Sequence, residues 1–281
     1  MSGSILVLGA TGTVGRPLVA DLTARGERVR AASRHGAPLP GTEGVRFDYE
    51  DAGTHEAAFA GADRVFALAP TGQLDTPRLL GPVIAQAAAR GIKVVLMTAM
   101  GADADESIPY RRVERTLEAS GTPFVILRPN WFMDNFGTYW AEGVARGEVA
   151  LPAGDGRTSF VDSRDIAAAA TGALTSDRFD GGAFEITGPE ALTYSEAATV
   201  LAEAAGRPIA YRATDDAEFV ATLTGAGLGP DYAGFLAAIM APVRLGFAAQ
   251  VTDSVERLAG RPPRTLRAWA EERCAALAGA A

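Results

Sequence analysis

Cysteine, histidine and lysine are scarce in this chain of 281 residues. The single cysteine, Cys274, excludes an intrachain disulfide and suits a reducing cytoplasm. With the two histidines, His35 and His55, it is too small a set for a His/Cys zinc site, so we expect no bound metal. The only lysine is Lys93, which excludes any mechanism that needs a catalytic lysine elsewhere in the chain.

Long apolar runs are also missing. The segments around Val94–Met100 and Phe235–Val243 fall far short of the roughly 18 residues that span a bilayer. The opening MSGSILVLGATG has no basic region, which predicts that no signal peptide is present. Acidic residues outnumber basic ones by 34 to 26, a net charge of −8, which disfavours a nucleic-acid or anionic-membrane partner. The sequence therefore predicts a cytoplasmic protein.

Short β-rich segments alternate with helical patterns in the first half of the chain. Strands are predicted at Ser4–Leu8, Arg28–Ala32, Val45–Phe47, Arg64–Leu68, Ile92–Thr98 and Phe124–Arg128. Helices are predicted after the first strand and at Thr54–Ala60, Thr76–Arg90 and Pro109–Ser120. Apolar strands separated by helices indicate a parallel sheet covered on both faces, so we predict an α/β fold with a doubly wound sheet.

The pattern loosens after about residue 150. Short strands are predicted at Thr158–Val161, Ala183–Thr187 and Pro208–Arg212, and a last helix at Thr265–Leu277. We expect residues 1–152 to form the core and residues 153–281 a smaller region, interwoven with the core. Residues 225–247 fit either a mobile cover over a site or an ordinary helix pair. The apolar residues of the last helix belong either to the core or to the face of a homodimer.

The first strand runs into the glycine-rich segment GATGTVG, after which a helix begins. The spacing G-x-x-G-x-x-G lets the backbone turn sharply and approach a pyrophosphate at the helix N-terminus. A strand before it and a helix after it are the context that a Rossmann-type dinucleotide site requires. The residues expected to contact the cofactor here are Gly9, Thr11, Gly12, Thr13, Val14 and Gly15.

The end of the second strand distinguishes NAD from NADP. A site for NAD places a carboxylate there, which binds the ribose hydroxyls. This chain has Ser33 and Arg34 instead, and a guanidinium suits a 2′-phosphate through a charge-assisted bidentate contact. The sequence therefore favours NADP(H), although a solvated loop arginine is the alternative interpretation.

Further cofactor contacts are expected at the carboxyl ends of the later strands, because ligands of open parallel sheets bind at that edge. An ordinary turn is the alternative at each position. The candidate residues are Asp48, Tyr49, Ala69, Pro70, Thr98, Ala99, Met100 and Pro129.

These motifs together resemble the NmrA-like group of atypical short-chain dehydrogenases/reductases. The resemblance rests on GATGTVG, on the Ser-Arg pair and on the segments Ser120–Phe136, Phe160–Ala167 and Val251–Leu266, in this order along the chain. It implies a Rossmann core, a smaller C-terminal substrate-binding region and a preference for NADP(H). The group includes NADPH-dependent quinone reductases, isoflavone-reductase-like and ergot-alkaloid enzymes, and regulators that bind a dinucleotide without turning it over.

The ordinary short-chain dehydrogenase uses Tyr-x-x-x-Lys, in which lysine lowers the pKa of the tyrosine that acts as acid. The comparable stretch runs from Tyr110 to Glu114, so glutamate stands where lysine is expected. A carboxylate raises the pKa of a neighbouring tyrosine. Tyr110 is therefore either a catalytic acid without the usual support or an exposed tyrosine at a helix start.

The segment after Pro129 mixes aromatic and amide side chains. Trp131, Phe132 and Phe136 offer flat apolar surface for a substrate, and the amides of Asn130 and Asn135 could fix a carbonyl. Asn130 is thereby a second catalytic candidate. Core packing is the alternative for the aromatic residues.

Three functions fit these observations. The first is an NADPH-dependent reductase that transfers hydride to a small, flat, apolar or conjugated acceptor of the quinone, enone or iminium type. The second is a non-catalytic redox sensor that binds NADP(H), which the missing lysine motivates. The third is a non-redox isomerase or cyclase on the same scaffold.

Overall fold

The computed structural model describes residues 3–273, which contacts divide into two compact units. The first unit takes in the chain up to Pro129 together with Ser163–Ile186 and Ser254–Pro262. The second unit contains Asn130–Asp162, Thr187–Asp253 and the chain from Pro263 onward. Each unit is therefore built from several separate segments.

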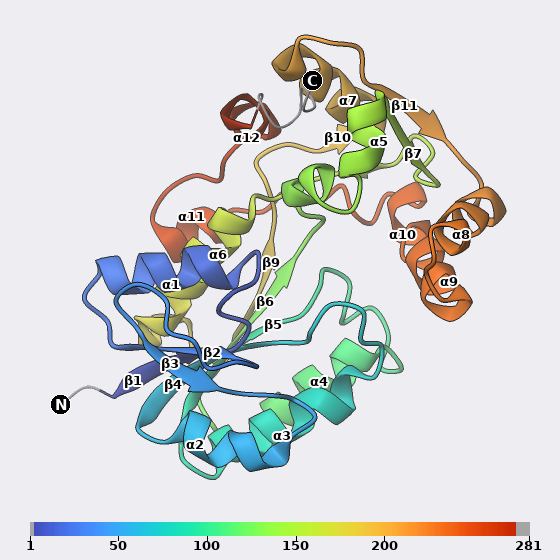
Figure 1. The fold of residues 1–281 in the computed structure, drawn as a ribbon. Coiled ribbons are helices and arrows are strands. Elements are labelled where there is room, and N and C mark those ends of the chain that lie inside the picture. Colours follow the sequence, from blue (N-terminus) through green and yellow to red (C-terminus); the bar gives the residue numbers. More distant parts are fainter. Residues whose placement is uncertain (1–2, 274–281) are drawn as a thin grey trace. The chain divides into compact units, whose positions relative to one another are not determined.

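A seven-stranded parallel sheet forms the centre of the first unit (Figure 1). Its strands are β1 (Ser4–Val7), β2 (Val29–Ser33), β3 (Glu43–Arg46), β4 (Ala62–Leu68), β5 (Lys93–Met97), β6 (Phe124–Pro129) and β9 (Gly182–Ile186). Their spatial order is β3-β2-β1-β4-β5-β6-β9. This topology confirms the predicted doubly wound Rossmann-type sheet.

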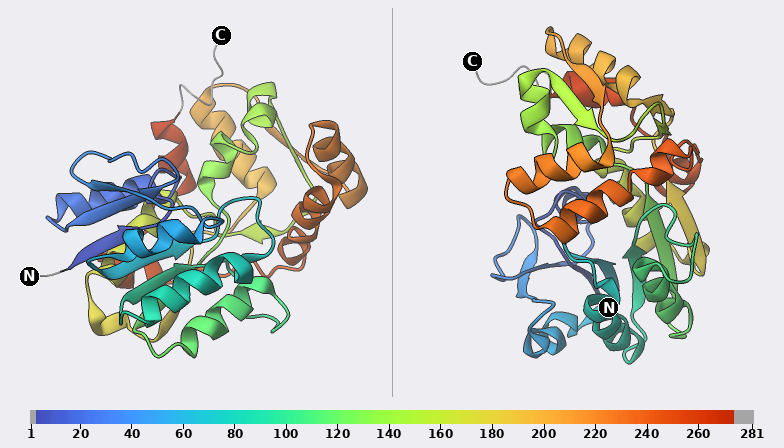
Figure 2. Two further views of the ribbon diagram at one scale, coloured as in Figure 1. Left: turned by 60° about the horizontal axis from the view of Figure 1, so that its bottom comes forward. Right: turned by 90° about the vertical axis from the view of Figure 1, so that its right-hand side faces the viewer.

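Helices cover both faces of this sheet (Figures 1 and 2). One face carries α2 (His55–Phe59), α3 (Thr76–Ala88) and α4 (Pro109–Glu118). The other carries α1 (Gly15–Ala24), α6 (Ser163–Leu174) and α11 (Ser254–Ala259). Two short 3₁₀ turns, Ala52–Thr54 and Asp177–Phe179, complete the unit.

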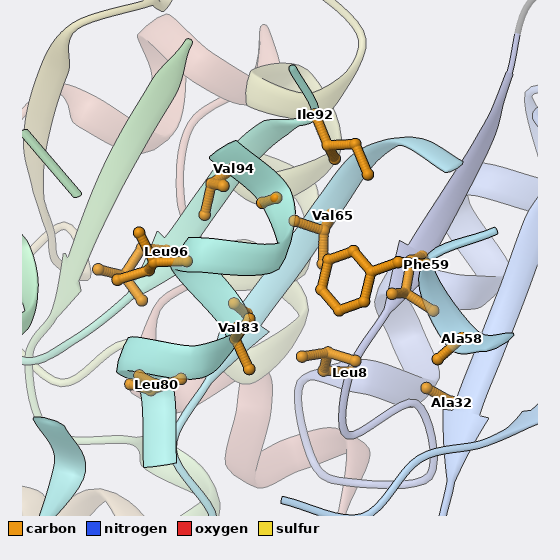
Figure 3. Packing of buried hydrophobic residues seen from close by; sticks show 14 of the residues in the cluster. Leu8, Ala32, Ala58, Phe59, Val65, Leu80, Val83, Ile92, Val94 and Leu96 are labelled. Atoms are coloured by element: carbon orange, nitrogen blue, oxygen red, sulfur yellow. The ribbon is translucent and has the colours of Figure 1, made fainter. Parts of the chain in front are cut away.

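The core beneath α2, α3 and α4 follows from the two-residue period of the strands. Alternate residues Val65 and Ala67 of β4, and Val94 and Leu96 of β5, point to this face and are fully buried. Figure 3 shows how Val83 and the ring of Phe59 lie among such side chains. Burying a side chain of this size contributes about 1.5–3 kcal/mol, which fixes the strands in register.

The second unit contains two small sheets and several helices. Strands β7 (Glu148–Leu151) and β11 (Ala210–Ala213) pair in parallel, and β8 (Arg157–Thr158) and β10 (Leu192–Thr193) pair antiparallel. The helices are η2 (Met133–Gly137), α5 (Ala141–Arg146), α7 (Tyr194–Ala205), α8 (Asp216–Gly225), α9 (Pro230–Ala238), α10 (Ala241–Arg244) and α12 (Leu266–Glu272). A Thr193–Glu196 capping box starts α7.

One predicted strand is longer than the observed one, and the last predicted helix extends beyond the described residues. The strand predicted at Thr158–Val161 ends at Thr158, because the amides of Ser159 and Val161 donate instead to the carbonyls of Ala248 and Trp131. In the last helix, Leu266 and Trp269 are buried in the core of the second unit, which supports the core interpretation. Cys274 and Leu277, which we also placed in that helix, lie outside the described residues.

Residues 225–247 contain α9, α10 and the end of α8, which fits the helix-pair interpretation because α8 and α9 pack together. Between residues 3 and 273, every helix is too short or too polar to cross a bilayer.

Candidate functional site

The connections of the first unit reverse direction beside β1. From β1 the chain proceeds through β2 to β3 on one side of the sheet, and β4, β5, β6 and β9 follow on the other side. Such a reversal separates the loops at the carboxyl ends of the two central strands, where open α/β sheets bind ligands. The glycine turn leaves the carboxyl end of β1 at this point.

The three glycines of the turn have different physical roles. Gly9 adopts φ +66°, a left-handed conformation that strains other residues. A Cβ at Gly15 would lie 2.0 Å from the carbonyl oxygen of Gly9, so only glycine lets α1 pack this closely on β1. A Cβ at Gly12 would meet only that carbonyl within 4 Å, at 3.2 Å, which leaves open space beside the turn.

Helix α1 begins without a cap or an acidic residue in its first turn. Val14 occupies the N-cap position, makes no side-chain hydrogen bond and is itself buried. The first amides of a helix lack intrahelical acceptors and carry the positive end of its dipole. Thr11, Gly12 and Thr13 are exposed around these amides. A pyrophosphate fits this turn, since its oxygens would accept hydrogen bonds that the chain itself leaves open.

The end of β2 carries cationic and hydroxyl groups. The Ser33 hydroxyl oxygen accepts a hydrogen bond from the amide of Gly36 at 3.0 Å, which leaves its proton available to a ligand. Arg34 is exposed, and no hydrogen bond or ion pair is found for it among residues 3–273. This guanidinium is available for the 2′-phosphate of NADP(H).

The loops after β3 and β4 are tied together by Tyr49. Its hydroxyl donates to the carbonyl oxygen of Leu68 at 2.5 Å, and burial raises its pKa. Asp48 accepts a hydrogen bond from the amide of Glu50 at 3.0 Å. Ala69 and Pro70 follow directly and are half-buried. The predicted contact residues of these two loops therefore lie at one edge of the sheet.

The loops after β5 and β6 are joined by backbone hydrogen bonds. The amide of Met100 donates to the carbonyl of Pro129 at 3.0 Å, and the half-buried Ala99 lies between Met100 and Thr98. Thr98 is buried, and its hydroxyl donates to a carboxylate oxygen of Glu114 at 2.8 Å. The hydroxyl proton of Thr98 is therefore used in a hydrogen bond within the first unit.

The residues of the Tyr-x-x-x-Glu stretch lie at the start of α4. Tyr110 packs, partly buried, against the core under α3 and α4. Glu114 is fully buried and pairs with Arg111 and Arg128. The only lysine, Lys93, is at the amino end of β5, where it pairs with Asp180. No lysine is thus available beside Tyr110 at the carboxyl ends of the strands.

In the second unit, Asn130 has a structural role. Its amide nitrogen donates to the hydroxyl of Ser159 at 2.7 Å and to the carbonyl of Ala248 at 2.8 Å. Its oxygen accepts from the amide of Trp131 at 2.9 Å. Both N–H donors are in use, so the geometry does not favour the predicted role of Asn130 in fixing a carbonyl.

The other residues of this segment fall into two groups. Phe136 is fully buried and packs against Trp140 and Phe160, as the core alternative expects. Trp131 is partly exposed and stacks on Trp140, with ring centroids 5.9 Å apart. Phe132 and Asn135 are half-buried. No side-chain hydrogen bond is found for Asn135 within the described range, so its amide can meet a ligand.

The sequence did not lead us to Arg128, which pairs with Glu114, or to Trp140, on which Trp131 stacks. Arg128 stands in an otherwise apolar strand, and Arg111, Glu114 and Glu118 repeat at the spacing of one helix face, which together signal a buried ion-pair network. In the part of the chain that the structure describes, no three His, Cys, Asp or Glu side chains form a group that could hold a metal ion.

Comparisons with known proteins agree with this geometry. Residues 9–177 match the model of an NAD(P)H-binding family. An NAD(P)H azoreductase of Xenophilus azovorans is 32% identical, over 98% of this chain and 100% of the relative.

Solved structures share the fold. An NADPH-dependent quinone oxidoreductase of Escherichia coli, complexed with NADPH, has a TM-score of 0.83 at 23% identity, covering 95% of this chain and 99% of its own. The negative transcriptional regulator NmrA, in complex with NADP, has a TM-score of 0.77 at 17% identity, covering 96% and 95%. The chain therefore belongs to the NAD(P)H-binding family.

Proposed function

We propose that this protein is an NADPH-dependent reductase that transfers hydride to a small, flat, apolar or conjugated acceptor of the quinone, enone or iminium type. The observation that carries the proposal is the buried Glu114 in the position of the usual lysine. The lysine that supports the tyrosine as the acid in an ordinary short-chain dehydrogenase is thereby missing beside Tyr110. The acceptors that remain are those that take up the electron pair themselves.

The residues of the first unit hold the cofactor. The amides at the start of α1 would bind the pyrophosphate, and Ser33 and Arg34 the 2′-phosphate. The nicotinamide ring supplies the hydride when the cofactor is bound. The loop after β5, which begins with Thr98, and the end of β6 at Pro129 would support the nicotinamide half of the cofactor. The second half of a doubly wound sheet binds that part of a dinucleotide.

In this proposal, residues of the segment that follows β6 bind the acceptor. Trp131 presents a flat aromatic surface, stiffened by its stacking on Trp140. Phe132 adds apolar surface, and the side-chain amide of Asn135 supplies a neutral donor that orients a carbonyl. The azoreductase and quinone oxidoreductase named among the similar proteins act on molecules that have this flat, conjugated character.

The test begins with a fluorescence titration of the purified protein with NADPH and NADH. A panel of quinones, enones and iminium compounds is then added, and the absorbance of NADPH is followed. We expect tighter binding of NADPH than of NADH, and oxidation of NADPH by at least one acceptor. Trp131→Ala should raise KM for the acceptor while leaving NADPH affinity unchanged.

The same titration separates the competing functions. Tight NADPH binding without turnover by any acceptor would contradict the reductase and favour the redox sensor. Product formed by the cofactor-free protein from a candidate substrate would favour the isomerase or cyclase. Failure to bind any dinucleotide would contradict the assignment of the glycine turn.

A further inference from the structure

The carboxylate of Glu114 accepts four hydrogen bonds inside the first unit. One oxygen accepts from the Thr98 hydroxyl at 2.8 Å and from Nε of Arg128 at 3.0 Å. The other accepts from Nη2 of Arg128 at 2.8 Å and from Nη1 of Arg111 at 2.9 Å. We call these four residues the Glu114 clamp. Charge-assisted bonds of this kind are the strong ones, and the bidentate contact with Arg128 also fixes its direction.

The Glu114 clamp joins three elements at the carboxyl edge of the sheet. Glu114 and Arg111 belong to α4, Thr98 is the first residue after β5, and Arg128 is the last but one residue of β6. The amide of Thr98 also donates to the carbonyl of Leu127 at 2.9 Å. Side-chain and backbone bonds thus hold the same two strand ends.

Arg128 carries the network beyond these elements. Its Nη1 donates to a carboxyl oxygen of Glu185 in β9 at 3.3 Å, and it also pairs with Asp103 in the loop after β5. The carboxyl ends of β5, β6 and β9 are therefore linked through one guanidinium. A guanidinium with this many partners has a single arrangement, which makes the strand ends rigid.

The position of the clamp in the sheet gives it a function. A doubly wound sheet binds a dinucleotide with two halves, and the glycine turn and Arg34 place the adenosine half over β1, β2 and β3. The strand ends held by Glu114 lie in the other half. We infer that Glu114 is a positioning residue for the nicotinamide half of the cofactor site, holding the loops after β5 and β6 from within the unit. The inference rests on the proposed function in that NADPH must bind at this edge.

Glu114 acts on this half of the site through the backbone and not by touching the cofactor. In an ordinary short-chain dehydrogenase, the lysine holds the nicotinamide ribose by direct contact. Glu114 cannot make such a contact, because it is fully buried and its acceptor positions are filled. Its task is to fix the backbone on which that part of the cofactor rests.

The test compares two ligands by isothermal titration calorimetry. NADPH binds both halves of the site, whereas adenosine 2′,5′-bisphosphate binds only the adenosine half. For Glu114→Gln we expect the Kd of NADPH to rise about 10-fold, since loss of charge-assisted hydrogen bonds costs about one such factor or more. The Kd of adenosine 2′,5′-bisphosphate should change less than about twofold, a change too small to reflect lost contacts.

A pair of milder variants keeps the test valid if Glu114→Gln does not fold. Thr98→Val removes only the hydrogen bond from the Thr98 hydroxyl to Glu114, so it should weaken the binding of NADPH and not that of adenosine 2′,5′-bisphosphate. Thr98→Ser keeps the hydroxyl and should restore wild-type affinity. Thr122→Val is the matched control, because the buried Thr122 hydroxyl donates to the Ile92 carbonyl at the amino edge of the same strands. Asp180→Asn is the control for a lost ion pair, since its partner Lys93 begins β5.

The results separate positioning from general stabilisation. If Glu114→Gln or Thr98→Val weakens both ligands equally, the clamp only stabilises the fold and the inference is wrong. Wild-type affinity of both variants for NADPH would also overturn it. Because binding is measured without an acceptor, a protein that oxidises no NADPH would contradict the proposed reductase and leave this result intact.

Discussion

The substitution Gly15→Ala tests the packing of the glycine turn. The added Cβ would lie 2.0 Å from the carbonyl oxygen of Gly9 and 2.8 Å from Cα of Ala10, both backbone atoms. Helix α1 would have to move by roughly 1.4 Å to bring the Cβ to an ordinary contact distance of 3.4 Å, which disturbs the buried Leu18 and Leu22. Overpacking of this kind costs about 3 kcal/mol, whereas alanine returns about 1 kcal/mol in helix propensity.

The net loss of about 2 kcal/mol corresponds to a fall in Tm of roughly 4–8 °C for a chain of this size. Thermal unfolding followed by circular dichroism measures it, and an NADPH titration should show weaker binding. Gly234→Ala is the control, because a Cβ at this position in α9 meets nothing within 4 Å and should raise stability slightly. An unchanged or higher Tm for Gly15→Ala, with wild-type NADPH affinity, would refute the reasoning.

Three further predictions concern charge and aromatic surface. Arg34→Ala should weaken the binding of NADPH by about 10- to 100-fold, because a charge-assisted contact is lost. The affinity for NADH should stay unchanged in the same titration. Burial raises the pKa of Glu185 from 4.5 to about 7, so the folded protein holds a proton that the unfolded chain releases between these values. Stability against urea should therefore fall as pH rises from 5 to 8, and Glu185→Gln should remove this part of the slope. Trp131→Phe should keep more acceptor affinity than Trp131→Ala in steady-state kinetics, because a smaller ring still offers apolar surface.

The glycine turn and the sheet could be predicted because their signals are local. Alternating apolar strands and helices predict a parallel sheet, and the G-x-x-G-x-x-G spacing predicts the sharp turn that follows its first strand. Ser33 ends the second strand and Arg34 follows it directly, so the place of this pair at that edge could also be predicted.

The roles of Asn130 and Phe136 depend on segments that are distant in sequence. Asn130 is bound by Ser159 and Ala248, which lie 29 and 118 residues later. Phe136 is buried by Phe160 among others. No pattern around an asparagine or a phenylalanine tells whether such partners arrive, so a ligand-binding and a structural role look alike in the sequence. Glu114 differs in this respect. It could be singled out in the sequence because it stands where the usual motif has lysine.

The isolation of Lys93 has a practical consequence. It is the only side-chain amine in the chain, it is 5% exposed, and it donates to the Ser176 carbonyl at 2.7 Å besides pairing with Asp180. Every other basic side chain apart from the histidines is an arginine, which acylating reagents do not modify. A lysine-directed reagent would therefore label one side chain only when the amino end of β5 opens. The rate of this modification, measured by mass spectrometry, would report how fast the central sheet opens at this one residue.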